Sequence, residues 1–185
     1  MAKAYIFLAD GFEEVEALTV VDFLRRAQID ISMVSITGDL KVTGSHQITV
    51  VADMLFGDGK FEEADLLILP GGMPGTTALM NHEGLDKLLR DFHGKNKTIA
   101  AICAAPSVLG TKGLLEGKRA TCYPGFESKL KGCIATGEDV VIDGNIITSK
   151  GPGTAMDFAL TLISVFKDKG TARKIAEGGM YKHYN

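Results

Sequence analysis

The sequence predicts an α/β fold of three layers, in which helices cover both faces of a mostly parallel sheet. Short, continuous apolar runs alternate with segments of helical period along the 185 residues. Such alternation is typical of parallel strands joined by crossover helices. A content of 45% hydrophobic and 23% charged residues is typical of a globular protein with a sizeable core. We therefore expect one domain over residues 1–185, without repeats or linkers.

The first half of the chain begins with a strand and a helix. The apolar run at 4–9 is typical of a strand buried on both faces. Residues 13–27 then show a helical period, with acids in the first turn and arginines in the last, as the helix dipole favours. We expect its inner stripe to be Val15, Leu18, Val21 and Leu24. We further expect a strand at 30–36, a polar, exposed hairpin or edge excursion at 41–51, a strand at 65–69 ending in a Pro-Gly-Gly turn, and a helix at 84–93.

The second half continues the alternation. We expect a strand at 97–102, a short helix from 107, a hairpin at 140–149 around Asp-Gly-Asn, and a C-terminal helix at 172–178. Before the last of these, a helix follows "GPGT", with Thr154 and Asp157 spaced as a capping box. Its expected inner stripe is Ala155, Phe158, Leu162 and Val165.

Composition excludes several classes of protein. A net charge of −3 without a basic stripe argues against nucleic acid as a partner. No run reaches the ~18 apolar residues of a membrane span, and the N-terminal run lacks the features of a signal peptide. We therefore expect a cytoplasmic protein that binds no membrane.

Cysteine and histidine usage agrees with that location. Three cysteines without CxxC spacing fit a reducing compartment, and neither a disulfide framework nor a zinc ribbon. We interpret Cys122 and Cys133 as structural. The four histidines are scattered without ligand spacing, so we expect no metal site.

Cys103 lies where the strand in "TIAAICAAPS" gives way to small residues and a proline. A residue on such a sharp strand-to-helix turn projects into the cleft at the carboxyl edge of the sheet, as in a nucleophile elbow. There the following helix would favour the thiolate and lower the pKa of the thiol. Buried cysteines are also common core residues, and the spacing alone leaves both interpretations open.

Two further stretches end at the same edge. In "LPGGMPG", Gly71 and Gly72 either punctuate a loop or bring backbone N–H groups close to a substrate oxygen. In "GFEEVE", the acids are ordinary partners of the helix dipole, but Glu16 lies beside the strand ends. If its carboxyl meets the thiol, burial would raise its pKa and fit it to carry a proton.

Together these stretches resemble the ThiJ/PfpI superfamily, in the branch of the Parkinson-associated protein deglycase and its bacterial ThiJ-like relatives. The resemblance rests on "GFEEVE", "VDFLRRA", "LPGG", "AAICAAP", "TSKGPGT" and "GGMYKHYN", in that order over nearly the whole chain. It implies a flavodoxin-like sandwich, similar to class I glutamine amidotransferases, and a homodimer. It also implies a nucleophilic Cys103, a conjugate carboxyl at Glu16, and an oxyanion or sulfinate pocket made by the N–H groups of Gly72 and Ala104.

The sequence departs from that pattern at two positions. Tyr123 stands where many relatives have a histidine, which removes the imidazole base that a Cys–His–acid peptidase needs. His46 stands where the branch often has an arginine, and either reaches the cleft of a partner subunit near Arg26 or is an ordinary solvated histidine. We count Arg26, His46 and Tyr123 as possible contacts for an anion or at a dimer cleft.

The resemblance implies a cofactor-independent glyoxalase or deglycase that acts on α-oxoaldehydes or on glycated protein. In this reaction Cys103 adds to the aldehyde, Glu16 moves protons, and water releases a 2-hydroxy acid. The alternative is a redox-responsive stress chaperone or sensor, in which Cys103 is oxidised to a sulfinate. A PfpI-type cysteine peptidase ranks below both because of Tyr123.

Overall fold

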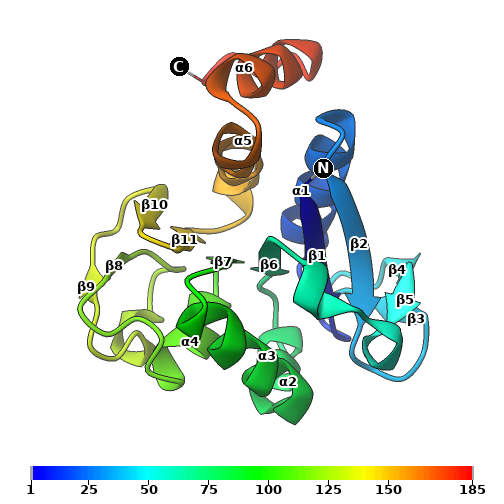
Figure 1. Ribbon diagram of the computed structural model, residues 1–185, viewed down its shortest axis with the longest axis vertical. Helices are drawn as coiled ribbons and strands as arrows, with labels where there is room; N and C mark the ends of the chain where they lie inside the picture. Colours follow the sequence, from blue (N-terminus) through cyan, green and yellow to red (C-terminus); the bar gives the residue numbers. More distant parts are fainter. Residues whose placement is uncertain (1, 185) are drawn as a thin grey trace.

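A central sheet of seven strands organises the computed structural model, which describes residues 2–184 (Figure 1). The strand order is β10-β11-β7-β6-β1-β2-β5, and only β10 runs antiparallel to its neighbour. These strands are β1 (Lys3–Leu8), β2 (Asp30–Ser35), β5 (Met54–Leu55), β6 (Leu66–Leu69), β7 (Thr98–Ile102), β10 (Val140–Asp143) and β11 (Ile146–Ser149). The mostly parallel sheet predicted from the alternating pattern is confirmed.

Helices cover both faces of the sheet, as Figure 1 shows. One face carries α1 (Glu14–Arg26), α5 (Ala155–Phe166) and α6 (Lys169–Gly178), and the other α2 (Gly75–Asn81), α3 (Glu83–Gly94) and α4 (Pro106–Thr111). Each helical layer packs on its own side of the sheet and forms a separate apolar core. The three-layer α/β sandwich is therefore confirmed. No helix among residues 2–184 is long and apolar enough to cross a membrane.

Short elements complete the fold. Two hairpin strands, β3 (Lys41–Thr43) and β4 (Thr49–Val51), pair antiparallel as expected, and β8 (Arg119–Ala120) pairs in parallel with β9 (Ile134–Ala135). Single 3-10 turns lie at Phe56–Asp58, Phe61–Glu63, Glu127–Lys129 and Pro152–Thr154. The sequence pattern did not predict β5, α2, β8 or β9, since elements of this length show little periodicity.

The inner stripes of α1 and α5 differ from the prediction. Val15 and Val165 are exposed, whereas Val20 and Ile163 are fully buried. The other predicted residues of both stripes are buried, except Leu18, which is half-buried, so the buried faces are broader than one residue per turn.

The predicted capping box at α5 is wrong. The Thr154 hydroxyl donates to the carbonyl of Gly151 and accepts from its N–H, at 2.9 and 3.1 Å, so it closes the preceding turn instead. The C-terminal helix begins at Lys169, earlier than expected, because the Asp168 carboxylate caps it through the Thr171 N–H at 2.8 Å.

The strand order places a topological switch point between β1 and β6. From β1 the chain builds outward through β2 and β5, and then returns to build the other way through β6, β7 and β11. In open α/β sheets the crevice at the carboxyl ends of such strands is the usual ligand site. The loops after β1, β6 and β7 meet there, and they carry the candidate residues.

Candidate active site

Cys103 occupies a strained turn directly after β7. Its φ is +65°, in the left-handed region that residues other than glycine rarely adopt. Two backbone hydrogen bonds stabilise this conformation. The Cys103 N–H donates to the Ser149 carbonyl at 2.9 Å, and the Cys103 carbonyl accepts from the Tyr123 N–H at 2.8 Å. The side chain is 9% exposed. The fold thus presents the thiol at the edge of the cleft, in the manner of a nucleophile elbow.

Glu16 meets this thiol from the first turn of α1. It is 0% exposed, and its Oε2 accepts a hydrogen bond from the Gly71 N–H at 2.8 Å. The carboxyl also lies close enough to the Cys103 thiol for each group to shift the pKa of the other. Its Oε1 is buried without a hydrogen-bond partner among the described residues. The structure therefore brings together a thiol and a buried carboxyl from segments far apart in the sequence.

Burial raises the pKa of Glu16 to about 7. The hydrogen bonds from Cys103 and Gly71 act in the opposite direction, and the negative charge of Glu13 adds a smaller upward contribution. A carboxyl of this kind exchanges its proton near neutral pH, which is the property needed in a general acid or base.

The pKa of the Cys103 thiol is raised, so the expected lowering by a helix N-terminus is wrong. Burial is the largest cause, followed by the charge of Glu16 and its hydrogen bond with the thiol. The N–H groups of Ala104 and Gly72 act in the opposite direction but are outweighed. Because α4 is only a short helix that begins at Pro106, its dipole is small. An ionised Cys103 sulfur therefore requires a protonated Glu16.

The two glycines allow the loops to approach closely. A side chain at Gly71 would place its Cβ 2.7 Å from both the Cys103 Cβ and the Glu16 Oε2. Gly72 has φ +88°, and a Cβ there would clash with the Glu13 nitrogen. The loop after β6 therefore fits against the thiol and the start of α1 only without side chains.

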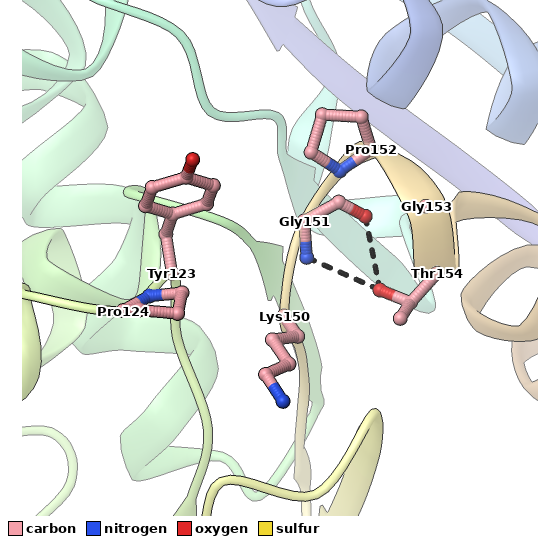
Figure 2. A pocket seen from close by; sticks show the side chains of 7 residues that line it. All are labelled: Tyr123, Pro124, Lys150, Gly151, Pro152, Gly153 and Thr154. Carbon is pink, nitrogen blue, oxygen red and sulfur yellow. Dashed lines mark hydrogen bonds between the residues drawn. The ribbon is translucent and has the colours of Figure 1, made fainter.

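Tyr123 lines a pocket of about 240 Å³ next to the Cys103 backbone. Figure 2 shows its ring standing across from the segment Gly151–Pro152, with Pro124, Lys150, Gly153 and Thr154 completing the lining. Lys150, whose Nζ donates to the Gly137 carbonyl at 3.1 Å, is a pocket residue that the sequence did not single out. Nothing in the sequence indicated that Lys150 lines a pocket, because a lone lysine after a strand is usually solvated.

Arg26 and His46 do not join the thiol within this chain. Arg26 is exposed in the last turn of α1 and pairs with Asp22, about 15 Å along the helix from Glu16 at 1.5 Å per residue. The His46 side chain is 67% exposed and its Nδ1 lies 2.9 Å from Oε2 of Glu14. Their predicted contacts with an anion or a partner subunit remain predictions.

The other two cysteines lie away from this arrangement. Cys122 is buried in the core on the α2–α4 side, and Cys133 packs partly buried against the same cluster. Burial raises the pKa of both thiols, which fits their interpretation as structural residues.

Glu14 has a role that its sequence neighbourhood did not reveal. Its carboxylate is buried and accepts from the His46 N–H at 2.8 Å and the Ile48 N–H at 3.4 Å. It therefore fastens the β3–β4 hairpin to α1 and is more than a partner of the helix dipole. The partners are more than 30 residues away, so no local pattern indicated them.

The fold and the site define a class of proteins: α/β sandwiches that hold a cysteine on a strand-to-helix elbow beside a buried carboxyl. Comparison with known proteins identifies the family. The DJ-1/PfpI family matches residues 2–165, and the chain belongs to it.

Individual relatives agree with this assignment. The chain is 42% identical to protein DJ-1 homolog B of Arabidopsis thaliana over 94% of its own length and 40% of the relative's, so it spans about two fifths of that protein. It is 29% identical to a deglycase of Pyrococcus abyssi over 89% of its own length and 99% of the relative's. An oxidized DJ-1 of Toxoplasma gondii matches with a TM-score of 0.95 and 36% identity, covering 99% of this chain and all of the other.

Proposed function

We propose that the protein is a glyoxalase or deglycase that uses Cys103 and Glu16 to convert α-oxoaldehydes, or their early adducts on protein, into 2-hydroxy acids. The observation that carries the proposal is the contact between an elbow thiol and a buried carboxyl whose pKa is raised to about 7. Membership of the DJ-1/PfpI family and the similarity to a protein named deglycase support it.

The proposed reaction begins with a protonated Cys103 thiol and an ionised Glu16. As the Cys103 sulfur adds to the aldehyde carbon, the thiol proton passes to Glu16, and the hemithioacetal oxygen forms near the N–H groups of Gly72 and Ala104. Glu16 passes this proton to the hemithioacetal oxygen, and the freed carboxylate then removes the proton from the former aldehyde carbon and returns it to the neighbouring carbon. The proton of the hemithioacetal hydroxyl passes to the neighbouring oxygen, which leaves a thioester on sulfur. Water hydrolyses the thioester to the 2-hydroxy acid and restores the thiol. In sum, one aldehyde and one water give one hydroxy acid.

The environment of the Cys103 thiol suits these reaction steps better than it suits peptide cleavage. A cysteine peptidase needs an imidazole to activate sulfur and protonate the leaving amine. Here Tyr123 follows Cys122 at the segment that contacts the Cys103 backbone, and the proton partner of the thiol is Glu16.

A second function, oxidation sensing, is supported by the N–H groups directed at the sulfur. Two backbone donors and a protonated Glu16 can hold the oxygens of a sulfinate, once peroxide has supplied two oxidising equivalents per oxygen added. The relative from Toxoplasma gondii was solved in an oxidized form.

One parallel experiment tests both functions. Wild type, Cys103→Ser, Glu16→Gln and the control Cys122→Ser are assayed for lactate from methylglyoxal, and separately for mass gain with peroxide. We expect Cys103→Ser to reduce lactate to the uncatalysed level, and Glu16→Gln to lose about 10²–10⁴-fold. Cys122→Ser should retain activity, since its thiol lies in the core.

The outcomes separate the two functions. Equal lactate formation by Cys103→Ser and wild type would overturn the glyoxalase proposal. Oxygen addition mapped to Cys122 or Cys133 in place of Cys103 would overturn oxidation sensing. If Cys103 takes up oxygen while no variant or wild type forms lactate, sensing stands and the enzyme proposal fails.

A further inference from the structure

Four side chains converge beside the start of α1, outside the thiol pocket. We call them the Glu–His cluster: Glu13, Glu14, Ser45 and His46. Two come from the loop that leads into α1 and from its first turn, and two from the turn of the β3–β4 hairpin. One atom from each of Glu13, Glu14 and His46 lies within 4.8 Å of the other two.

The spacing of the donor atoms matches a coordination shell. His46 Nδ1 lies 2.9 Å from Glu14 Oε2 and 3.5 Å from Glu13 Oε2. The Ser45 Oγ lies 3.1 Å from each of His46 Nδ1 and Glu13 Oε2, and 3.3 Å from Glu14 Oε2. A tetrahedral ion with bonds of about 2.0–2.1 Å needs ligand–ligand edges of about 3.3–3.4 Å. The two distances between candidate ligand atoms, 2.9 and 3.5 Å, lie on either side of that edge, so an ion fits with movements of a few tenths of an ångström.

The cluster is also held in place by the surrounding backbone. The Glu14 side chain is 5% exposed, and its other oxygen, Oε1, is fixed by the N–H groups of His46 and Ile48. This leaves Oε2 directed at the cluster. Outer hydrogen bonds that orient a ligating carboxylate in this way are characteristic of metal sites.

The Glu–His cluster has more negative than positive charge, which favours binding of a cation. Among residues 2–184, His46 is the only basic side chain within ion-pair distance of Glu13 or Glu14. Two carboxylates therefore face one imidazole, and a divalent ion balances them where a single proton on the imidazole does not.

We propose that the Glu–His cluster binds a divalent transition metal ion, with Zn²⁺ as the expected occupant. An imidazole and two carboxylates are typical zinc ligands, and a water in the fourth position can hydrogen-bond to the Ser45 hydroxyl. On binding, the ion displaces the proton between His46 Nδ1 and Glu14 Oε2, which passes to solvent. The scattered histidines did not predict this site because its ligands come from two segments 32 residues apart.

The test uses Cys103→Ser protein, so that the thiol pocket cannot take the metal, after treatment with a chelator. Zn²⁺ binding is measured by calorimetry, and Co²⁺ binding by visible absorption. We expect one equivalent per chain and the intense Co²⁺ bands of tetrahedral coordination. His46→Gln should weaken binding by at least about tenfold, since it removes the imidazole. Because the His46 side chain is exposed, this variant should keep the fold.

The matched control is His183→Gln, which removes a histidine from the C-terminal segment. It should bind the metal as the parent does, and Glu13→Gln should weaken binding like His46→Gln. Equal binding by parent and His46→Gln, equal loss in His183→Gln, or half an equivalent per chain would each overturn the proposed single-chain site. None of these readouts depends on enzyme activity, so the result is independent of the proposed function.

Discussion

Glu16 is the residue at which catalysis and stability oppose each other. Burial raises its pKa from an ordinary value of 4.5 to about 7, so ionising it in the folded protein costs free energy. The folded chain therefore binds more protons than the unfolded chain between these two values. By linkage, this residue makes the protein less stable as the pH rises through that window. The cost is retained because a carboxyl that exchanges protons near neutrality serves the proposed reaction.

We expect Glu16→Gln to stabilise the protein at pH 8 and much less at pH 5. The full shift, from 4.5 to about 7, corresponds to about 3 kcal/mol at 1.36 kcal/mol per pKa unit, present above pH 7 and absent below pH 4.5. Gln keeps the carbonyl oxygen that accepts from Gly71. Urea unfolding of metal-free wild type and variant at both pH values measures the difference. The exposed control Glu62→Gln should show no such change with pH, and an equal gain at both pH values for Glu16→Gln would contradict the assignment.

The loops after strands are the elements that build the site. The turn after β7 holds Cys103 at positive φ, and the loop after β6 brings Gly71 between the thiol and the carboxyl. We expect Gly71→Ala to lower activity by about 100-fold or more, because its Cβ would displace both reacting groups, and small displacements in a reacting pair cost about that much.

A matched glycine tests this explanation. Gly94 lies at the end of α3 without a strained φ, and a Cβ added there would meet no atom within 4 Å. Gly94→Ala should therefore leave lactate formation unchanged. Thermal unfolding shows whether Gly71→Ala is folded. An active Gly71→Ala, or an equal loss in Gly94→Ala, would show that the close approach at Gly71 is not what positions the pair.

Local patterns predicted the elements better than the contacts between them. The buried strands, the two hairpins and the elbow position of Cys103 followed from apolar runs and turn residues. Burial of Glu14, and the raised thiol pKa at Cys103, depend on groups that only the fold brings close. Faces of helices were predicted less well, as Val15 shows, because a one-residue shift in a stripe depends on how the helix meets the sheet.

At the scale of the whole molecule, α1 and the β3–β4 hairpin segment carry three exposed apolar side chains among the described residues, 2–184. Val15 on α1, with Ile48 and Val51 on the β3–β4 hairpin, are exposed, and the Ile48 N–H bonds Glu14 beside Val15. We call these three residues the α1–hairpin face. Exposed apolar side chains on two neighbouring elements are candidates for an interaction surface. It supports the proposal that the protein is a homodimer, with two copies of the face in contact about a twofold axis.

We expect wild type to have the mass of a dimer by light scattering after size exclusion, and Val51→Lys to shift it toward the monomer. A lysine on each copy of a twofold face places like charges opposite each other and removes apolar contact. Ile134→Lys is the matched control, because Ile134 is exposed to a similar extent, 63% against 61%, but lies on β9 outside the face. Both variants should unfold at temperatures close to wild type, since neither side chain is in the core. A monomeric wild type, or dissociation by Ile134→Lys alone, would contradict a dimer contact through the α1–hairpin face.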